Sequence, residues 1–157
     1  MNFADRYDSL FLIYGDRYHV PWQLLKAQVK AESDFNPDAV NPRTGATGLA
    51  QFMPRTWDEW RDGTPGIDEI IDKLKLLNPK DPEDAIQAQA AYMDWLIRVA
   101  GDGEKALAAY NWGIGNLRKC IAAHGDAWRD HLPDETQNYL AKIQKQFAAY
   151  TAGKGDS

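Results

Sequence analysis

The run Ala31-Glu32-Ser33-Asp34-Phe35-Asn36-Pro37 ends a predicted helix and carries a glutamate on the apolar side of that helix. Leu25, Gln28 and Val29 precede Glu32 by seven, four and three positions, so the four side chains share one face. Water solvates a carboxylate poorly on such a face, and its pKa therefore rises. A glutamic acid that keeps its proton near neutral pH can donate it, so we predict a catalytic acid here. The alternative is a partly exposed residue at the end of a helix.

Length and composition indicate one globular domain. The 157 residues are enough to bury a core without disulfide or metal support, and we expect a domain over residues 1–150 followed by a disordered tail over residues 151–157. Hydrophobic residues make up 44% and charged residues 26% of the chain. The net charge of −5 argues against binding to nucleic acid or to anionic membranes. We predict no membrane span and a monomer.

Helical spacing of apolar residues, together with proline and glycine positions, predicts most of the secondary structure. The expected helices run from Phe3 to Gly15, from Pro21 to Glu32 or Ser33, through Trp57 and Trp60, from Pro82 (capped by Asp81) to Gly101, across Leu107 to Asn111, and from Pro133 past Phe147. Prolines and glycines interrupt the chain after Phe35, and we expect the resulting loop to form a wall of the site.

A second segment with chemical character follows that loop: Gly45-Ala46-Thr47-Gly48-Leu49-Ala50-Gln51-Phe52-Met53-Pro54. Its glycines let the backbone approach a ligand closely, and Gln51 has amide donors and a carbonyl acceptor suited to a sugar. The alternative is a glycine-containing turn with a polar edge.

Other chemistries lack their motifs. No His-Glu-x-x-His, Gly-x-Ser-x-Gly or phosphate-binding loop is present. Cys120 and His124 lie four apart on a predicted helix, but two candidate ligands do not make a zinc site, and a buried thiol with a solvated histidine is expected instead. We therefore predict no metal and no cofactor.

The two segments around Glu32 and Gln51 resemble the first two motifs of the soluble lytic transglycosylase family, which shares the goose-type lysozyme fold. The third resembling motif is Ala109-Tyr110-Asn111-Trp112-Gly113-Ile114-Gly115, similar to the family's Ala-Tyr-Asn-Ala-Gly. The fourth is Pro133-Asp134-Glu135-Thr136-Gln137-Asn138-Tyr139, similar to its Glu-Thr-x-x-Tyr. Four motifs in family order make the resemblance specific. It implies a mainly α, single lysozyme-like helical domain with a substrate cleft and a short β or irregular element after Glu32.

Two regions depart from the family pattern. Trp112 and Ile114 replace a small residue and a proline, so we expect a narrower or more aromatic groove near Asn111. The segment Arg61–Asp68 matches no family motif, and both a lid and a surface loop fit it.

The resemblance implies that Glu32 cleaves peptidoglycan glycan strands as a lytic transglycosylase. Ordinary glycosidases use two carboxylates, whereas here the substrate's own groups would replace the second carboxylate and the water. Glu32 would protonate the oxygen between N-acetylmuramic acid and N-acetylglucosamine, then take the proton of the muramyl C6 hydroxyl as a 1,6-anhydro ring closes. The implied groove residues are Ser33, Gln51, Met53, Tyr110, Asn111, Glu135 and Tyr139, with Ser33 and Tyr139 also holding Glu32. Helix periodicity alone favours core packing for Tyr139, and a helix N-terminus alone favours an acidic residue at position 135.

Two alternatives stay open. One is a hydrolytic lysozyme in which Asp34, Asp38, Asp58 or Glu59 serves as the second carboxylate. The other is a non-catalytic peptidoglycan-binding or virion structural module on the same fold. Action on the bacterial cell wall, in the periplasm, is expected in the enzymatic case. The first residues lack the pattern of a secretory signal, which suits a phage-delivered, virion-associated or trimmed protein.

Overall fold

The computed structural model describes residues 3–61 and 77–153, and the fold is mainly helical, as predicted. The helices are α1 (Asp8–Tyr18), α2 (Trp22–Ser33), α3 (Pro54–Trp60), α5 (Pro82–Ala100), α6 (Gly103–Trp112), α7 (Ile114–His124) and α8 (Asp134–Thr151), with 3-10 turns η1 (Phe3–Asp5) and η2 (Gly125–His131). Within the described ranges, every helix is too short or too polar to span a bilayer.

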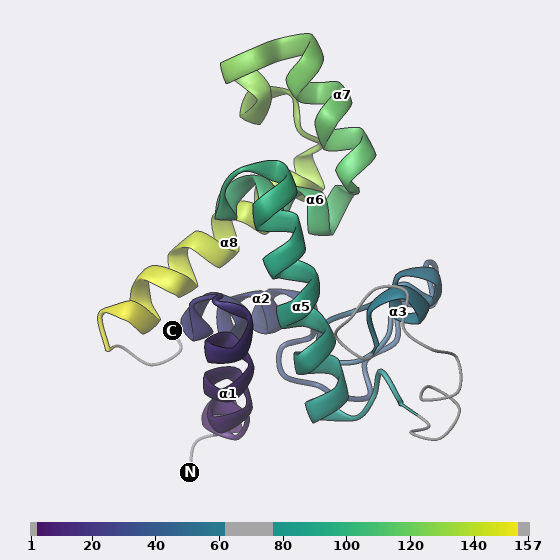
Figure 1. Ribbon diagram of the computed structural model, residues 1–157, viewed down its shortest axis with the longest axis vertical. Coiled ribbons are helices and arrows are strands. Elements are labelled where there is room, and N and C mark those ends of the chain that lie inside the picture. Colours follow the sequence, from purple (N-terminus) through teal and green to yellow (C-terminus); the bar gives the residue numbers. More distant parts are fainter. Residues whose placement is uncertain (1–2, 62–76, 154–157) are drawn as a thin grey trace.

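Helix α5 is the central element of the fold (Figure 1). It packs against α1 and α2, against α3 and against α6 and α7. Helix α2 lies against α8, so the end of the chain returns to an early helix. The core between these helices includes fully buried Phe11, Leu25, Met93, Leu96 and Ile143.

The first helix continues beyond the glycine where we predicted its end. Gly15 lies inside α1, which runs to Tyr18 and ends at His19 in a left-handed conformation. A Cβ atom on Gly15 would lie 2.7 Å from the carbonyl oxygen of Val20. The glycine therefore serves close packing between α1 and the chain leading into α2, and it does not terminate the helix. Helix α2 begins at Trp22, one residue later than predicted, and Pro21 occupies its N-cap position.

The boundaries around α5 follow the predicted capping residues. The side chain of Asp81 accepts a hydrogen bond from the backbone N–H of Asp84, and Pro82 occupies the first turn. Gly101 ends the helix with φ of 110°, and Asp102 then caps α6 through the N–H of Lys105. The Asp81 cap and the Gly101 stop need no tertiary contact, which is why the sequence alone located them.

The segment between α2 and α3 is a compact loop with two isolated antiparallel bridges, Val40 to Thr47 and Thr47 to Phe52. They are the short β element expected after Glu32. Gly48 adopts φ of +83°, and a Cβ there would lie 1.8 Å from the carbonyl oxygen of Pro79. The loop rests on a second, largely aromatic cluster formed by Phe52, Trp57, Trp60, Tyr92, Trp95 and Tyr110.

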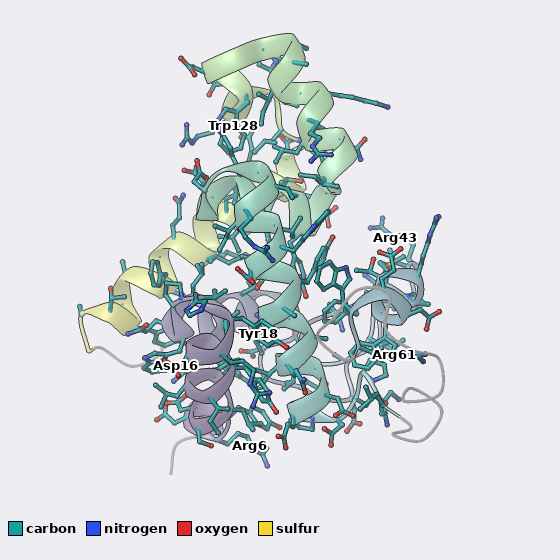
Figure 2. All side chains as sticks on the ribbon, viewed as in Figure 1. Arg6, Asp16, Tyr18, Arg43, Arg61 and Trp128 are labelled. Atoms are coloured by element: carbon teal, nitrogen blue, oxygen red, sulfur yellow. The ribbon has the colours of Figure 1, made fainter. Side chains whose placement is uncertain are left out.

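Helix α7 and η2 project from the body above α6 (Figure 1). Trp128 is buried beneath α7, where its carbonyl oxygen lies 3.5 Å from the Cys120 sulfur (Figure 2). The thiol is buried and His124 is exposed, as expected, and the His124 ring stacks on that of His131. Among the residues the structure describes, no three potential ligating side chains gather at one point.

Two sequence predictions fall largely outside the described residues. Of the segment Arg61–Asp68, only Arg61 is described. Of the expected tail over residues 151–157, Thr151 is the last residue of α8, and residues 154–157 lie outside the described range.

Candidate active site

A groove of about 670 Å³ lies where the end of α2, the loop before α3, α6 and α8 meet. It is lined by Ala31, Glu32, Asn41, Arg43, Thr44, Ala46, Gln51, Met53, Tyr110, Asn111, Glu135, Asn138, Tyr139 and Lys142. The lining includes every predicted site residue except Ser33.

Glu32 lies in the last turn of α2, partly exposed to the groove. The hydroxyl of Tyr139 donates a hydrogen bond to its Oε2 atom at 3.2 Å. Burial raises the pKa of Glu32 to about 8, the Tyr139 hydrogen bond opposes this rise, and the negative charge of Glu135 adds to it. At neutral pH the carboxyl therefore holds a proton that it can donate, and once ionised it can accept one.

Tyr139 is buried at the floor of the groove on α8. Its hydroxyl oxygen accepts a hydrogen bond from Gln28 Nε2 at 3.0 Å. Burial first, and the neighbouring charge of Glu32 second, hold the pKa of Tyr139 well above its ordinary value. The tyrosine is thus a neutral hydrogen-bond donor to Glu32 at all physiological pH values.

Helix α6 contributes Tyr110 and Asn111 from its last turn. The Tyr110 hydroxyl donates to the carbonyl oxygen of Ala50 at 2.8 Å and so ties α6 to the loop. The Thr136 hydroxyl donates to Oδ1 of Asn111 at 2.8 Å. Because the amide oxygen of Asn111 is engaged, its NH₂ group is the part available to a ligand in the groove.

Gln51 and Met53 come from the loop that precedes α3. Gln51 has φ of +52°, and its Nε2 donates to the carbonyl oxygens of Ala39 at 3.1 Å and Gly48 at 2.9 Å. Both amide N–H groups are therefore used inside the loop, and the Oε1 atom is left as an acceptor. Met53 is 44% exposed and offers an apolar surface at the groove.

Ser33 has a different place from the other predicted residues. It is absent from the groove lining, and its hydroxyl lies 2.8 Å from the Leu49 carbonyl oxygen and 3.2 Å from that of Val29. The contact with Leu49 joins the end of α2 to the loop and so fixes the chain direction just after Glu32.

Five further polar residues line the groove: Asn41, Arg43 and Thr44 from the loop that was expected to form a wall of the site, and Asn138 and Lys142 from α8. The last two follow Glu135 by three and seven positions, so helical spacing from that motif residue could have identified them. The loop residues show no periodicity. Figure 2 shows Arg43 on the side of the molecule where α3 lies, away from α1.

Within the described part of the chain, the groove lining has two carboxylates, Glu32 and Glu135. The four carboxylates considered for a hydrolytic mechanism, Asp34, Asp38, Asp58 and Glu59, are not among the lining residues. Trp112 and Ile114 are also absent from the lining, and both pack against the main core.

Comparison with known proteins identifies the family of this chain. A family model described as "Transglycosylase SLT domain" matches residues 9–133. The chain is similar to a membrane-bound lytic murein transglycosylase F of Maricaulis maris, with 33% identity over 142 residues that cover 82% of this chain and 28% of that protein. A protein of the same name from Pasteurella multocida is 32% identical over 122 residues, which cover 69% of this chain and 22% of the relative.

Solved structures agree with this family. A 70-kDa soluble lytic transglycosylase in complex with bulgecin A matches with a TM-score of 0.79 and 26% identity over 99% of this chain and 25% of that one. The 70-kDa soluble lytic transglycosylase of Escherichia coli matches with a TM-score of 0.74 and 26% identity over 96% and 25%. The chain thus spans less than a third of the length of the relatives it matches.

Proposed function

The chain belongs to the transglycosylase SLT domain family, and from that premise we propose that it is a peptidoglycan lytic transglycosylase. Its substrate is the glycan strand, cut at the β-1,4 bond between N-acetylmuramic acid and N-acetylglucosamine. It acts as a monomer on the bacterial cell wall. The observation that carries the proposal is Glu32, held partly buried in the groove with a pKa of about 8 and a hydrogen bond from Tyr139.

In the first step Glu32 is the general acid. Its proton goes to the glycosidic oxygen as the bond from that oxygen to the muramyl C1 breaks, and N-acetylglucosamine leaves as an alcohol. The carbonyl oxygen of the muramyl acetamido group attacks C1 and takes the place of a nucleophilic carboxylate. The Tyr139 hydrogen bond stabilises the carboxylate that Glu32 becomes.

In the second step the same carboxylate is the base. It takes the proton of the muramyl C6 hydroxyl, O6 attacks C1, and the bond from the acetamido oxygen to C1 breaks. The product has a 1,6-anhydro ring, no water is consumed, and Glu32 ends the cycle protonated. A pKa near 8 suits both roles because the carboxyl gives up and regains a proton within each turnover.

Hydrolysis is the second candidate, and Glu135 is the observation that favours it. This residue is the other carboxylate of the groove, exposed in the first turn of α8, where it could activate a water. Its position at a helix N-terminus is also structurally favourable for an acidic residue.

Mass spectrometry of the muropeptides released from purified peptidoglycan separates these reactions. The native protein should release products one water lighter than reducing-end muropeptides, and Glu32→Gln should release none. Asp38→Asn, which removes an exposed carboxylate outside the groove lining, is the matched control and should keep full activity. Reducing ends that disappear in Glu135→Gln would establish hydrolysis instead. Binding without release by the folded native protein would indicate a non-catalytic module.

A further inference from the structure

Two glutamines in the interior form a hydrogen-bonded chain that ends at Glu32. Gln28 on α2 and Gln89 on α5 are both 0% exposed. Gln89 Nε2 donates to the Leu25 carbonyl oxygen at 3.1 Å and to Gln28 Oε1 at 2.7 Å. Gln28 Nε2 donates to the Tyr139 hydroxyl at 3.0 Å, and that hydroxyl donates to Glu32 Oε2 at 3.2 Å. The chain thus connects α5, α2 and α8 to the carboxyl of the groove.

The first acceptor fixes the direction of every bond in this chain. A carbonyl oxygen can only accept, so Gln89 must turn its NH₂ group toward Leu25. The same NH₂ group serves Gln28, which must therefore present Oε1 to Gln89 and its own NH₂ to Tyr139. The Tyr139 oxygen accepts from Gln28, and its single proton is left for Glu32.

This direction also determines which oxygen of neutral Glu32 carries the acidic proton. Tyr139 cannot turn its hydroxyl round, because Gln28 offers it no acceptor on that side. Oε2 of Glu32 therefore remains an acceptor in both protonation states. In a protonated carboxyl the carbonyl oxygen is the better acceptor, so the proton resides on the other oxygen, Oε1.

Packing alone does not account for the two amides. Oε1 of Gln89 is buried and has no hydrogen-bond partner among the residues that the structure describes, a state that typically costs about 1–3 kcal/mol. Leucines at both positions 28 and 89 would fill a similar space without that cost. The buried pair is better explained by what its N–H groups do.

We propose that Gln28 and Gln89 are positioning residues that hold Tyr139 as a one-way donor to Glu32 and keep the acidic proton of Glu32 on Oε1. The catalytic meaning of this arrangement rests on the proposed function. The arrangement itself can be tested without substrate.

Other charged and polar groups of the groove also influence the pKa of Glu32, and they must stay the same in every variant tested. Those that line the groove with it come from the loop, α6 and α8: Arg43, Tyr110, Glu135 and Lys142. Substitutions at positions 28 and 89 alter none of them, because both side chains lie in the interior behind Tyr139.

The experiment is a ¹³C NMR titration of the Glu32 carboxyl in the native protein, Gln28→Leu and Gln89→Leu. Without Gln28, Tyr139 loses the donor that strengthens its own donation, and without Gln89 the Gln28 amide is free to turn its oxygen toward Tyr139. Both changes disfavour ionised Glu32, so its pKa should rise by about 0.5–1 unit in each variant. In a Tyr139→Phe background the same substitutions should leave the pKa unchanged. Gln23→Leu, the same change elsewhere on α2, is the control.

An unchanged pKa in both single variants, or an equal rise when Tyr139 is phenylalanine, would overturn the proposal. If a single variant fails to fold because it strands one amide, the double variant Gln28→Leu/Gln89→Leu removes both partners and carries the same expectation. The alkaline limb of the pH–rate profile should move with the pKa. The expected pKa pattern without turnover would refute only the proposed function, and turnover with an unmoved pKa would refute only the positioning role.

Discussion

The raised pKa of Glu32 predicts that the native protein is less stable than Glu32→Gln at alkaline pH but not at acid pH. Below about pH 4.5 the carboxyl is protonated in both the folded and the unfolded chain, so it costs nothing. Between 4.5 and about 8 the unfolded chain releases the proton while the folded one retains it, and folding becomes steadily less favourable. Above pH 8 the penalty is constant. The glutamine variant has no such penalty.

The size of the effect follows from the shift. A rise from 4.5 to about 8 corresponds to about 5 kcal/mol at about 1.4 kcal/mol per unit if the group is wholly shielded from water. Glu32 is partly exposed, and solvent screening reduces the expected difference to about 2 kcal/mol. In a domain of this size, such a difference raises the midpoint of thermal unfolding by about 4–8 °C.

Urea unfolding of both proteins at pH 4, 6, 8 and 9 measures this difference directly. The two free energies of unfolding should coincide near pH 4 and diverge by about 2 kcal/mol at pH 9, with the variant more stable. Asp38→Asn controls for the loss of one negative charge. A difference between native protein and Glu32→Gln that stays constant across this range would refute the reasoning, because the burial of Glu32 would then not favour its protonated form.

Three further substitutions test other parts of the structure. Tyr139→Phe removes the hydrogen bond to Glu32 and should raise that pKa by about 1–2 units, measured by carboxyl NMR; a fall would contradict the assigned donor. Gly48→Ala should lower the free energy of unfolding in urea by more than about 2 kcal/mol, because the added Cβ atom would collide with the Pro79 carbonyl oxygen. An unchanged free energy would show that the loop backbone moves to make room for the Cβ atom. Lys26→Met removes the buried ammonium group that pairs with Asp5 and Asp8. The free energy of unfolding in urea at pH 7 should fall by about 1–3 kcal/mol, and an unchanged value would contradict this expectation.

Local patterns were sufficient to locate Glu32 and most of the helices. The spacing from Leu25 to Glu32 placed the carboxyl on an apolar face, and caps such as Asp81 act within a few residues of sequence. The place of Tyr139 could not be decided from local sequence patterns. Helix periodicity predicted that the Tyr139 side chain packs in the core, whereas the family resemblance predicted that it lies near Glu32. In the structure the side chain is buried and its hydroxyl donates a hydrogen bond to Glu32.

Features that depend on distant parts of the chain could not be predicted from local patterns. Gln28 was recognised on the apolar face, but its partner Gln89 lies 61 positions away on α5. Gly15 looked like a helix terminator because its close contact with Val20 arises only when the chain turns back into α2. The engagement of both Gln51 N–H groups likewise depends on how the loop folds around Ala39 and Gly48.

The late position of α8 in the sequence links the burial of Glu32 to the completion of folding. The two residues are 107 positions apart, and α8, which carries the tyrosine, is the last helix of the described chain. Because α8 packs against α2 and lines the groove, a chain without α8 exposes Glu32 to more water, and its pKa falls toward the ordinary value of about 4.3, at which a glutamate is ionised at neutral pH. Such a fragment holds no proton to give. We therefore expect a chain that ends before α8 to lack the proposed transglycosylase activity.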